Sequence, residues 1–421
     1  MNKPETIICH IDVNSAYLSW TAVHRIQFLG ESLDLRTVPS VIGGSEESRH
    51  GIVLAKSGPA KKYGIKTGEP LFQARQKCPN LIVVPPDHAL YAEASRQLIR
   101  LLQEESPVVD QYSIDEAWID LSGMERLYGP PVLAAERIKN RIREELGFTV
   151  NIGVSSNKLL AKMASDFQKP DLVHTLFPEE IPDKLWPLPV RELFYVGSST
   201  EKKLLEMGIR TIGQLAAADP QRLRKSLHQH SQIIWEFANG RCGHFLDAQH
   251  TENKSYGNST TTSQDVVDRE TAHRILLGLC ESVGSRLRKD AQQGSCISVT
   301  IRSSSFANSS QQMQLPFPTA ATMEIFRAAC QVFDRLWDGR TPLRLLGVSM
   351  SSLENSEEWQ PSLFQEANHE KLRKADAAID QLRNRFGKQA IVRASLLQKD
   401  KDTGGSQKEL PAFCKKPSPE D

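Results

Sequence analysis

Two groups of acidic residues follow apolar, strand-like runs and could together carry chemistry. Asp12 comes directly after the run Ile7–Ile11, and Asp115 and Glu116 interrupt a second apolar stretch over 107–119. If the two strands are neighbours in a sheet, these carboxylates converge, and they raise each other's pKa unless divalent cations lie among them. Carboxylate oxygens suit Mg²⁺, and a pair of such ions is the usual device for in-line phosphoryl transfer. The alternative for any single acidic pair is a solvated turn.

The periodicity of the surrounding sequence predicts the elements that would position these acids. Apolar residues at helical spacing predict two helices, and these alternate with strands in a pattern typical of a βαββαβ, ferredoxin-like domain. In such a sheet Asp12 and Asp115 would lie on adjacent strands. The predicted elements are a strand turning into a helix over 7–20, helices over 88–104 and 132–146, and strands near 81–85, 107–121 and 148–154.

Size, charge and cysteine usage set the broad class. A chain of 421 residues exceeds the size of a single core, about 250–300 residues, so we expect several domains. The net charge of +1 does not by itself favour nucleic-acid binding, although a basic groove can be offset by acidic surface elsewhere. Seven cysteines without a CxxC pair argue against a disulfide framework and suit a reducing cytosol. No signal peptide or membrane-spanning stretch is present, so we expect a cytoplasmic protein without membrane contact.

The rest of the chain has the pattern of further domains. Repeated glycine turns predict a small, loop-rich lobe over 21–79. Prolines between 170 and 189 mark a boundary, and the pattern that follows is typical of a helix–hairpin–helix, whose amides bind a DNA phosphate. The chain departs from this motif at one place, because Tyr195 occupies the position of the first glycine of the hairpin. The last region combines strands and helices: strands over 296–301 and 345–350, and helices over 270–289 and 319–336.

An ordered set of motifs surrounds the acidic residues. The motifs are Ile11–Tyr17, Ala60–Gly68, Cys78–Leu81, Ser113–Asp120, Asn151–Lys158, Ala161–Asp166 and Lys169–Pro170. In their order and spacing the chain resembles the Y-family of DNA polymerases, the lesion-bypass class, of the bacterial DNA polymerase IV type. The resemblance covers roughly residues 7–350.

This resemblance implies an α+β, multidomain fold of the right-hand polymerase type. It has a ferredoxin-like βαββαβ palm, small fingers, a helical thumb with a helix–hairpin–helix, and an α/β little finger that grips DNA. The implied domains are the palm over 1–20 and 80–170, fingers 21–79, thumb 171–242, a linker 243–258, little finger 259–355, a clamp-binding motif with a C-terminal helix over 356–398, and a disordered tail 399–421.

The family's catalytic roles fall on the acidic residues. Asp12 and Asp115 would bridge two Mg²⁺ ions, with the carbonyl of Val13 completing one coordination sphere. Glu116 would hold or tune the ion that acts on the primer 3′-hydroxyl. These implied roles make Asp12, Asp115 and Glu116 the catalytic carboxylates.

Three further residues match positions at which the family binds deoxynucleoside triphosphates. Tyr17 falls at the steric gate, where an aromatic ring excludes the 2′-hydroxyl of a ribonucleotide. Lys169 and Lys61 would contact the triphosphate, Lys61 replacing an arginine that grips it with a bidentate fork. Gly58 stands where many relatives have a phosphate-binding tyrosine, for which Lys56 or Ser57 would compensate. Without the motifs, the lysines would be interpreted as surface charges and Tyr17 as core.

Near the C-terminus a short peptide is similar to the motif by which bacterial polymerases bind the sliding clamp. Gln360, Leu363 and Phe364 would be its anchors, with the apolar pair entering a pocket of the clamp. The helix that follows has apolar residues on one face, and we expect it to pack against the body of the protein. That face consists of Leu372, Ala375, Ile379, Leu382 and Phe386.

The resemblance predicts a monomeric DNA-directed DNA polymerase that extends primers past damaged bases. Low fidelity and low processivity are implied by small fingers and thumb, and no segment is typical of a proofreading exonuclease. Primer–template DNA, deoxynucleoside triphosphates and the sliding clamp would be its partners. Two alternatives stay open: the catalytic subunit of the accessory-dependent bacterial lesion-bypass polymerase, and an inactive, clamp-tethered DNA-binding scaffold.

Overall fold

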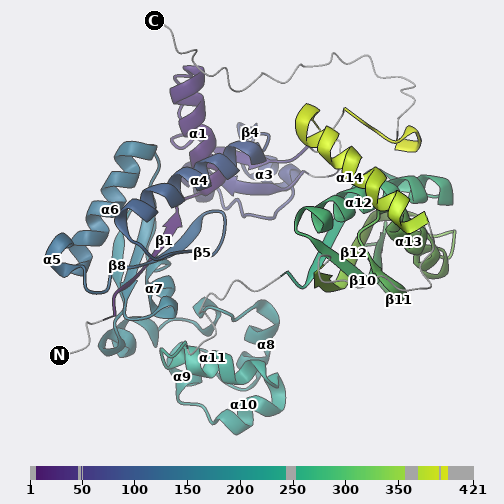
Figure 1. The fold of residues 1–421 in the computed structure, drawn as a ribbon. Coiled ribbons are helices and arrows are strands. Elements are labelled where there is room, and N and C mark those ends of the chain that lie inside the picture. The colour runs from purple at the N-terminus through teal and green to yellow at the C-terminus, as the bar shows by residue number, and fades with distance from the viewer. Residues whose placement is uncertain are drawn as a thin grey trace, which may run out of the picture. The chain divides into compact units, whose positions relative to one another are not determined.

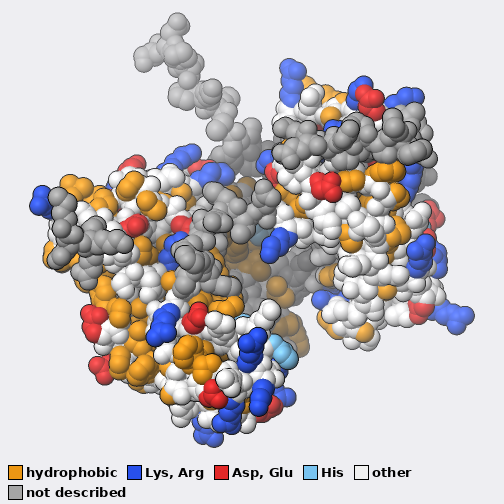
Figure 2. Space-filling view, turned by 60° about the horizontal axis from the view of Figure 1, so that its bottom comes forward, with side chains coloured by type: hydrophobic (Ala, Val, Ile, Leu, Met, Phe, Trp, Pro, Cys, Tyr) orange, Lys and Arg blue, Asp and Glu red, His pale blue; other side chains and the backbone are white. Residues whose placement is uncertain are grey.

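The computed structural model describes residues 6–45, 49, 51–242, 253–355, 368–387 and 390–396. The chain divides into two compact units, Met1–Thr251 and Glu252–Asp421, and Figure 1 labels many of their elements. On the face drawn in Figure 2, basic and acidic side chains are interspersed. Among the described helices, none has the length and apolarity needed to cross a membrane.

The first unit is built on a five-stranded sheet and two helices. Its elements are β1 Ile8–Val13, α4 His88–Glu105, β5 Val109–Gln111, β6 Glu116–Asp120, α6 Pro131–Leu146, β7 Val150–Ser155 and β8 Val173–Thr175. The strand order is β5–β6–β1–β7–β8, and β1 runs antiparallel to both β6 and β7. In chain order β1, α4, β5, β6, α6 and β7 form a ferredoxin-like βαββαβ arrangement, which confirms the predicted palm.

Side chains alternate along β1 and divide the sheet into two faces. Cys9 and Ile11 belong to the core that α4 and α6 close on one face. Ile8 packs on the other face against α7 (Lys158–Ser165). His10 and Asp12 therefore lie on the α7 side of the sheet, and so does Glu116, which pairs directly with Asp12.

A smaller sheet follows the first helix of the chain. Its elements are α1 Ala16–Leu29, β2 Ser40–Gly43, β3 Val53–Lys56, α2 Gly58–Lys62, α3 Leu71–Lys77 and β4 Ile82–Val84. The strand order is β3–β2–β4, and a separate core closes around Val41, Val53 and Leu71. The strand predicted near 81–85 exists as β4, but its assignment to the palm was wrong. It pairs in parallel with β2 instead.

Four short helices complete the first unit. They are α8 Ser198–Glu206, α9 Ile212–Ala216, α10 Pro220–Leu227 and α11 His230–Ala238; the short α5 spans Glu125–Tyr128 of the palm. Leu204, Leu215 and Phe237 contribute to a core that continues into α7. Tyr195, just before α8, has a φ of 73°. Its backbone thus adopts the left-handed region that glycine favours, even though a tyrosine occupies the hairpin position.

The second unit is a four-stranded antiparallel sheet with helices on one face. Its elements are β9 Ser255–Val266, α12 Arg269–Lys289, β10 Gln292–Ser303, β11 Asn308–Thr319, α13 Thr322–Leu336, β12 Leu343–Asn355 and α14 Asn368–Phe386. The strand order is β11–β10–β12–β9. Both predicted helices and both predicted strands are present. The edge strands β9 and β11 were not predicted, and β9 begins inside the range 243–258 that was interpreted as linker.

The C-terminal helix α14 packs against α12 and α13, as predicted, but through ionic contacts. Asp376 is buried, accepts a 2.7 Å hydrogen bond from the backbone N–H of Thr322, and forms an ion pair of 3.3 Å with Arg288. Leu382 and Phe386 are 40% and 62% exposed. The prediction of a buried apolar face was therefore wrong for these two residues and for Ala375, which is also exposed.

Candidate active site

The structure brings most of the predicted site residues to one cavity of about 580 Å³ in the first unit. The cavity lies at the C-terminal end of β1, next to the turn that precedes β6. Residues of α1, α2 and the segment after α7 complete its walls. The predicted residues that line it are Asp12, Val13, Tyr17, Lys61, Asp115 and Lys169. Glu116 is the one predicted catalytic residue of the first unit that does not line it.

Hydrogen bonds fix the turn that carries Asp115. The backbone N–H of Val13 donates to the carbonyl of Asp115 at 3.1 Å, which ties the end of β1 to this turn. The Ser113 hydroxyl donates to Asp115 Oδ1 at 2.7 Å and accepts from the backbone N–H of Glu116 at 3.1 Å. The serine of the motif therefore orients one acid and holds the backbone of the next.

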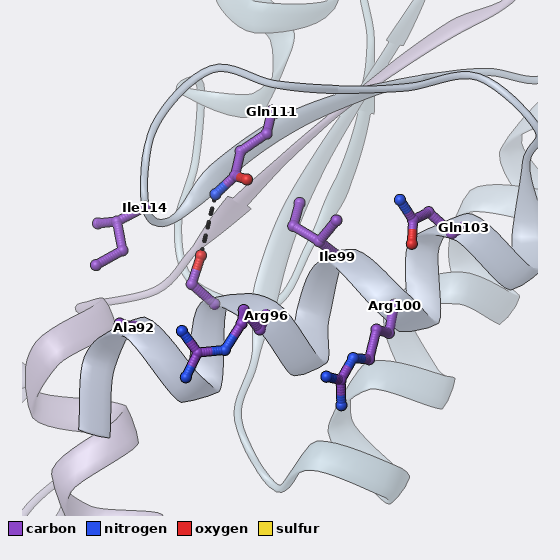
Figure 3. Close-up of a pocket in the computed structure, with 8 residues that line it drawn as sticks. Ala92, Arg96, Ile99, Arg100, Gln103, Gln111 and Ile114 are labelled. Carbon is purple, nitrogen blue, oxygen red and sulfur yellow. Dashed lines mark hydrogen bonds between the residues drawn. The ribbon is translucent and has the colours of Figure 1, made fainter. Parts of the chain in front are cut away.

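The same turn is braced against α4. Figure 3 shows the Gln111 side chain reaching toward α4, where its amide donates to Ser95 Oγ at 3.1 Å. The same amide donates to the carbonyl of Ser113 at 2.9 Å. A second hollow of about 530 Å³, lined by Arg96 and Arg100, lies beside this brace. Ile114 lines both hollows, so the turn separates them.

Asp12 is a buried carboxylate with an ammonium partner. Lys169 Nζ lies 2.7 Å from Asp12 Oδ2 and 2.8 Å from Asp166 Oδ1. Burial raises the pKa of Asp12 to about 6, against the opposing effect of Lys169. Burial alone would lower the pKa of Lys169, but its two carboxylate partners raise it. Lys169 thus forms an ion pair with the carboxylate that was predicted to bind Mg²⁺.

Glu116 is engaged on the α7 side of the sheet. Its Oε2 lies 2.8 Å from Lys162 Nζ and 3.7 Å from His10 Nε2. Burial alone would raise the pKa of Glu116, but His10 and Lys162 outweigh it and lower the pKa to about 2. Within the described part of the chain, no three His, Cys, Asp or Glu side chains are grouped closely enough to hold a metal. Only Asp12 and Asp115 of the three predicted acids share the cavity.

Tyr17 lies at the start of α1 in the cavity wall. Its ring stacks on Tyr91 of α4, with centroids 4.2 Å apart and an interplanar angle of 7°. Tyr91 is fully buried and its hydroxyl lies 3.3 Å from Thr21 Oγ1. The ring of Tyr17 is therefore held flat against a fixed neighbour, as a rigid wall requires.

Two lysines from the region of the smaller sheet line the cavity, and no arginine is among its described lining residues. Lys61 lines it from α2, and Lys56 lines it from β3 while donating to Thr67 Oγ1 at 3.1 Å. The Ser57 hydroxyl accepts from the backbone N–H of Ala60 at 3.1 Å and so caps α2. Because Ser57 is committed to the backbone, Lys56 is the better candidate to compensate for Gly58.

Sequence reasoning missed Lys162, His10 and Gln111 as neighbours of the candidate catalytic acids. Lys162 lies in the motif 161–166, and that was the available signal. His10 lies two residues before Asp12, and residues i and i+2 of a strand share a face. The clamp-binding candidates Gln360, Leu363 and Phe364 lie outside the described residues, as does the predicted tail 399–421.

Comparison with known families agrees with this architecture. The impB/mucB/samB family model matches residues 11–166, its C-terminal domain matches 253–363, and the helix–hairpin–helix motif of the family matches 178–209. The chain belongs to the Y-family of DNA polymerases. Its cavity and turn therefore lie within the region that the family model matches, 11–166, apart from Lys169 and Pro170.

Curated relatives match this Y-family chain over nearly its full length. It is 47% identical to the DNA polymerase IV of Clostridium acetobutylicum, over 94% of this chain and 99% of the relative. It is 37% identical to the DNA polymerase IV of Acetivibrio thermocellus, over 93% and 98%. The DNA polymerase IV 2 of Bacillus subtilis is 34% identical, over 93% and 95%.

A solved structure agrees in fold. A Y-family DNA polymerase chimera superposes with a TM-score of 0.70 at 22% identity, covering 82% of this chain and 98% of the chimera. This likeness supports the right-hand polymerase fold.

Proposed function

We propose that this chain is a DNA-directed DNA polymerase for translesion synthesis, of low fidelity and low processivity and without proofreading. The observation that carries the proposal is the single cavity that joins two acids, an aromatic wall and two lysines. These are the groups needed to hold cations, a sugar and a triphosphate. Membership of the Y-family and the names of the curated relatives favour the same activity.

The donor set of the cavity fits a divalent cation. Asp12 is buried beside Asp115, and burial of a carboxylate near a second one is unfavourable unless positive charge lies close by. The carboxylates of Asp12 and Asp115 and the carbonyl of Val13 would hold two Mg²⁺ ions, whose oxygen preference they meet. When bound, these ions lower the pKa of the primer 3′-hydroxyl and stabilise the leaving pyrophosphate. Glu116 would hold or tune the ion that acts on the primer 3′-hydroxyl.

Two lysines would receive the triphosphate. Lys61 approaches from α2, and Lys169 approaches from the segment after α7. Lys169 must leave Asp12 Oδ2 when cation and nucleotide arrive, and its 34% exposed side chain leaves room for this exchange. The triphosphate then replaces Asp12 as the anionic partner of Lys169, so that no charge is left uncompensated.

Tyr17 would select the sugar. Its stacking on Tyr91 holds the ring in the cavity wall. The 2′-hydroxyl of a ribonucleotide would therefore have to displace two stacked rings rather than one mobile side chain. Deoxynucleoside triphosphates are therefore the proposed substrates.

The sheet of the second unit offers a polar face for DNA. Ile297, Val299 and Ile301 belong to the core under α12 and α13, so the residues between them lie on the opposite face. There Ser298 pairs with Ser349, and Thr300 pairs with Gly347. Small hydroxyl side chains and backbone suit contacts to phosphates, which position a duplex without reading its sequence. The hairpin before α8 would add a phosphate contact.

The proposal extends to partners and compartment. The chain would work as a cytoplasmic monomer on primer–template DNA and bind the sliding clamp through Gln360, Leu363 and Phe364. The double variant Leu363→Ala with Phe364→Ala is expected to lose clamp-stimulated synthesis and keep the basal reaction. Loss of both activities would contradict the proposed clamp motif.

Primer extension tests the proposed activity directly. The purified chain is incubated with Mg²⁺, four deoxynucleotides and either undamaged or lesion-bearing templates, with Asp115→Ala in parallel. Asp110→Ala is the matched control, because Asp110 forms an ion pair with Lys158 outside the cavity. Short products that disappear only in Asp115→Ala are expected.

Absence of extension by the wild type, with measurable primer–template binding, would contradict the proposal. Extension restored by recombinase and accessory subunits would then identify the accessory-dependent alternative. Continued inactivity would identify the scaffold.

A further inference from the structure

Glu116 has two buried polar neighbours that the proposed reaction does not use. Lys162 of α7 and His10 of β1 both approach the same carboxylate oxygen, Oε2. The Lys162 contact, at 2.8 Å, is a hydrogen-bonded ion pair, whereas 3.7 Å from His10 Nε2 exceeds hydrogen-bond length. Lys162 is thus the direct partner of Glu116, and His10 is a neighbour.

The surroundings of Lys162 hold its ammonium in place. Its side chain is 8% exposed, and its Nζ lies 5.5 Å from the ring centroid of Tyr112 and 5.3 Å from that of Phe194. Aromatic faces at such distances attract a cation. The backbone carbonyl of Lys162 also accepts a 2.8 Å hydrogen bond from Ser165 Oγ, which in turn contacts His10 Nδ1 at 2.8 Å. Helix, strand and glutamate are therefore linked in one network.

We infer that Lys162 is a positioning residue of the active site, which fixes Glu116 by one carboxylate oxygen. The inference rests on the proposed polymerase function and assigns Lys162 no contact with substrate. A carboxylate fixed at one oxygen loses most of its rotational freedom, so its other oxygen occupies a defined place. Groups that orient such carboxylates from behind commonly contribute about 10–100-fold in activity.

The position of Lys162 separates its effect from that of Lys169. Lys162 pairs with Glu116, which lies outside the cavity, whereas Lys169 pairs with Asp12 inside it. Loss of Lys162 should therefore slow the chemical step and leave nucleotide binding nearly unchanged. A lysine that merely stabilised the fold would affect both.

The test is a cycle of four proteins: wild type, Lys162→Met, Glu116→Gln and the double variant. Single-turnover extension gives the rate of the chemical step, and nucleotide binding to the protein–primer–template complex is measured with Ca²⁺ in place of Mg²⁺. Lys162→Met is expected to slow the step by about 10–100-fold, with nucleotide affinity changed less than about threefold. Because Lys162 acts through Glu116, the double variant should be no slower than Glu116→Gln alone.

Three controls keep the outcomes distinct. Lys158→Met removes another lysine of α7, which pairs with Asp110 instead, and should extend primers at the wild-type rate. Lys162→Arg keeps the charge and should recover most of the rate. The double variant leaves no unpaired buried charge, so it remains testable if Lys162→Met does not fold.

Rate losses that multiply in the double variant, or equal losses in rate and nucleotide affinity, would overturn the inference. Wild-type extension in the same assay tests the proposed function separately. Inactivity of the wild type would defeat that function, whereas an active wild type with an unaffected Lys162→Met would defeat only the role of Lys162.

Discussion

The close approach of α7 to β7 leaves no room for a side chain at Gly153 of the palm. A Cβ atom at Gly153 would lie 1.9 Å from the carbonyl oxygen of Ala161, 2.5 Å from the backbone nitrogen of Ser165 and 2.9 Å from Ala164 Cβ. All three atoms belong to α7, and two of them are backbone. The helix as a whole must therefore move in the Gly153→Ala variant, because no side chain can rotate away.

The geometry sets the size of this movement. To lie even 3.0 Å from the new Cβ atom, the carbonyl oxygen of Ala161 must move away by about 1 Å. Lys162 follows Ala161 directly and would move with it. Its 2.8 Å contact with Glu116 would then lengthen toward 4 Å, which breaks the hydrogen bond. Forced overpacking of this kind costs about 3 kcal/mol in the free energy of unfolding. A misplacement of about 1 Å at a catalytic group can cost on the order of 100-fold in rate.

Two measurements check this prediction. Calorimetry of Gly153→Ala should show the melting temperature of the first unit lowered by about 6–12 °C, which is what about 3 kcal/mol produces in a unit of this size. Primer extension at a temperature where the variant is folded should fall by about 10–100-fold in kcat.

Gly278→Ala is the matched control. Gly278 lies inside α12, and the nearest atom to its Cβ would be Leu396 Cδ2 at 4.0 Å. The same substitution should there stabilise the second unit by about 0.5–1 kcal/mol, since alanine favours helix over glycine. A Gly153→Ala variant with the stability and rate of the wild type would show that β7 and α7 do not approach as closely as described, and would refute the reasoning.

Three further substitutions have defined outcomes. Tyr17→Ala should raise the ratio of ribonucleotide to deoxyribonucleotide incorporation, measured as kcat/KM for each, while Tyr17→Phe should not; an unchanged ratio in Tyr17→Ala would remove the residue from sugar selection. Asp376→Ala should lower the unfolding free energy of the second unit by about 1–3 kcal/mol, because the buried backbone N–H of Thr322 loses its acceptor, while Arg288 and Arg393 each keep another carboxylate; calorimetry that shows no loss of stability would contradict this. Gln111→Leu should lower kcat by about tenfold through loss of the brace on the Asp115 turn, whereas Gln103→Leu, in the same hollow, should match the wild type.

The palm and its acids were predictable from sequence because each signal was local and repeated. The helical faces of α4 and α6 and the apolar run of β1 predict the βαββαβ order, and the register then follows from burial of one sheet face. The strand β4 was misassigned because an apolar run of three to five residues does not specify its partner. The edge strands β9 and β11 are rich in Ser, Thr, Asn and Gln, since one of their faces is exposed. Strand propensity therefore does not predict these two strands, and their conformation depends on pairing with β12 and β10.

The contacts around the acids were less predictable than the acids themselves. Lysine is most often a solvated surface residue, and nothing in the spacing of Lys162 distinguishes it from Lys158 four residues earlier on α7. The packing of α7 on the sheet, which Gly153 permits, places one lysine on Glu116 and the other on Asp110. Sequence periodicity fixes which residues share a helix face. It does not fix which carboxylate that face meets.

The two lysines of the site differ in exposure rather than in distance, and this difference assigns their roles. Lys162 and Lys169 lie 2.8 Å and 2.7 Å from their carboxylates, yet their side chains are 8% and 34% exposed. An ion pair near solvent is weakened by water and salt, whereas a buried one is screened much less. Under the proposed function, an incoming triphosphate would therefore draw Lys169 away from Asp12 and leave Lys162 on Glu116. In this proposal the ammonium of Lys169 is the replaceable partner and that of Lys162 the permanent one, so Glu116 would stay oriented while Asp12 changes partner.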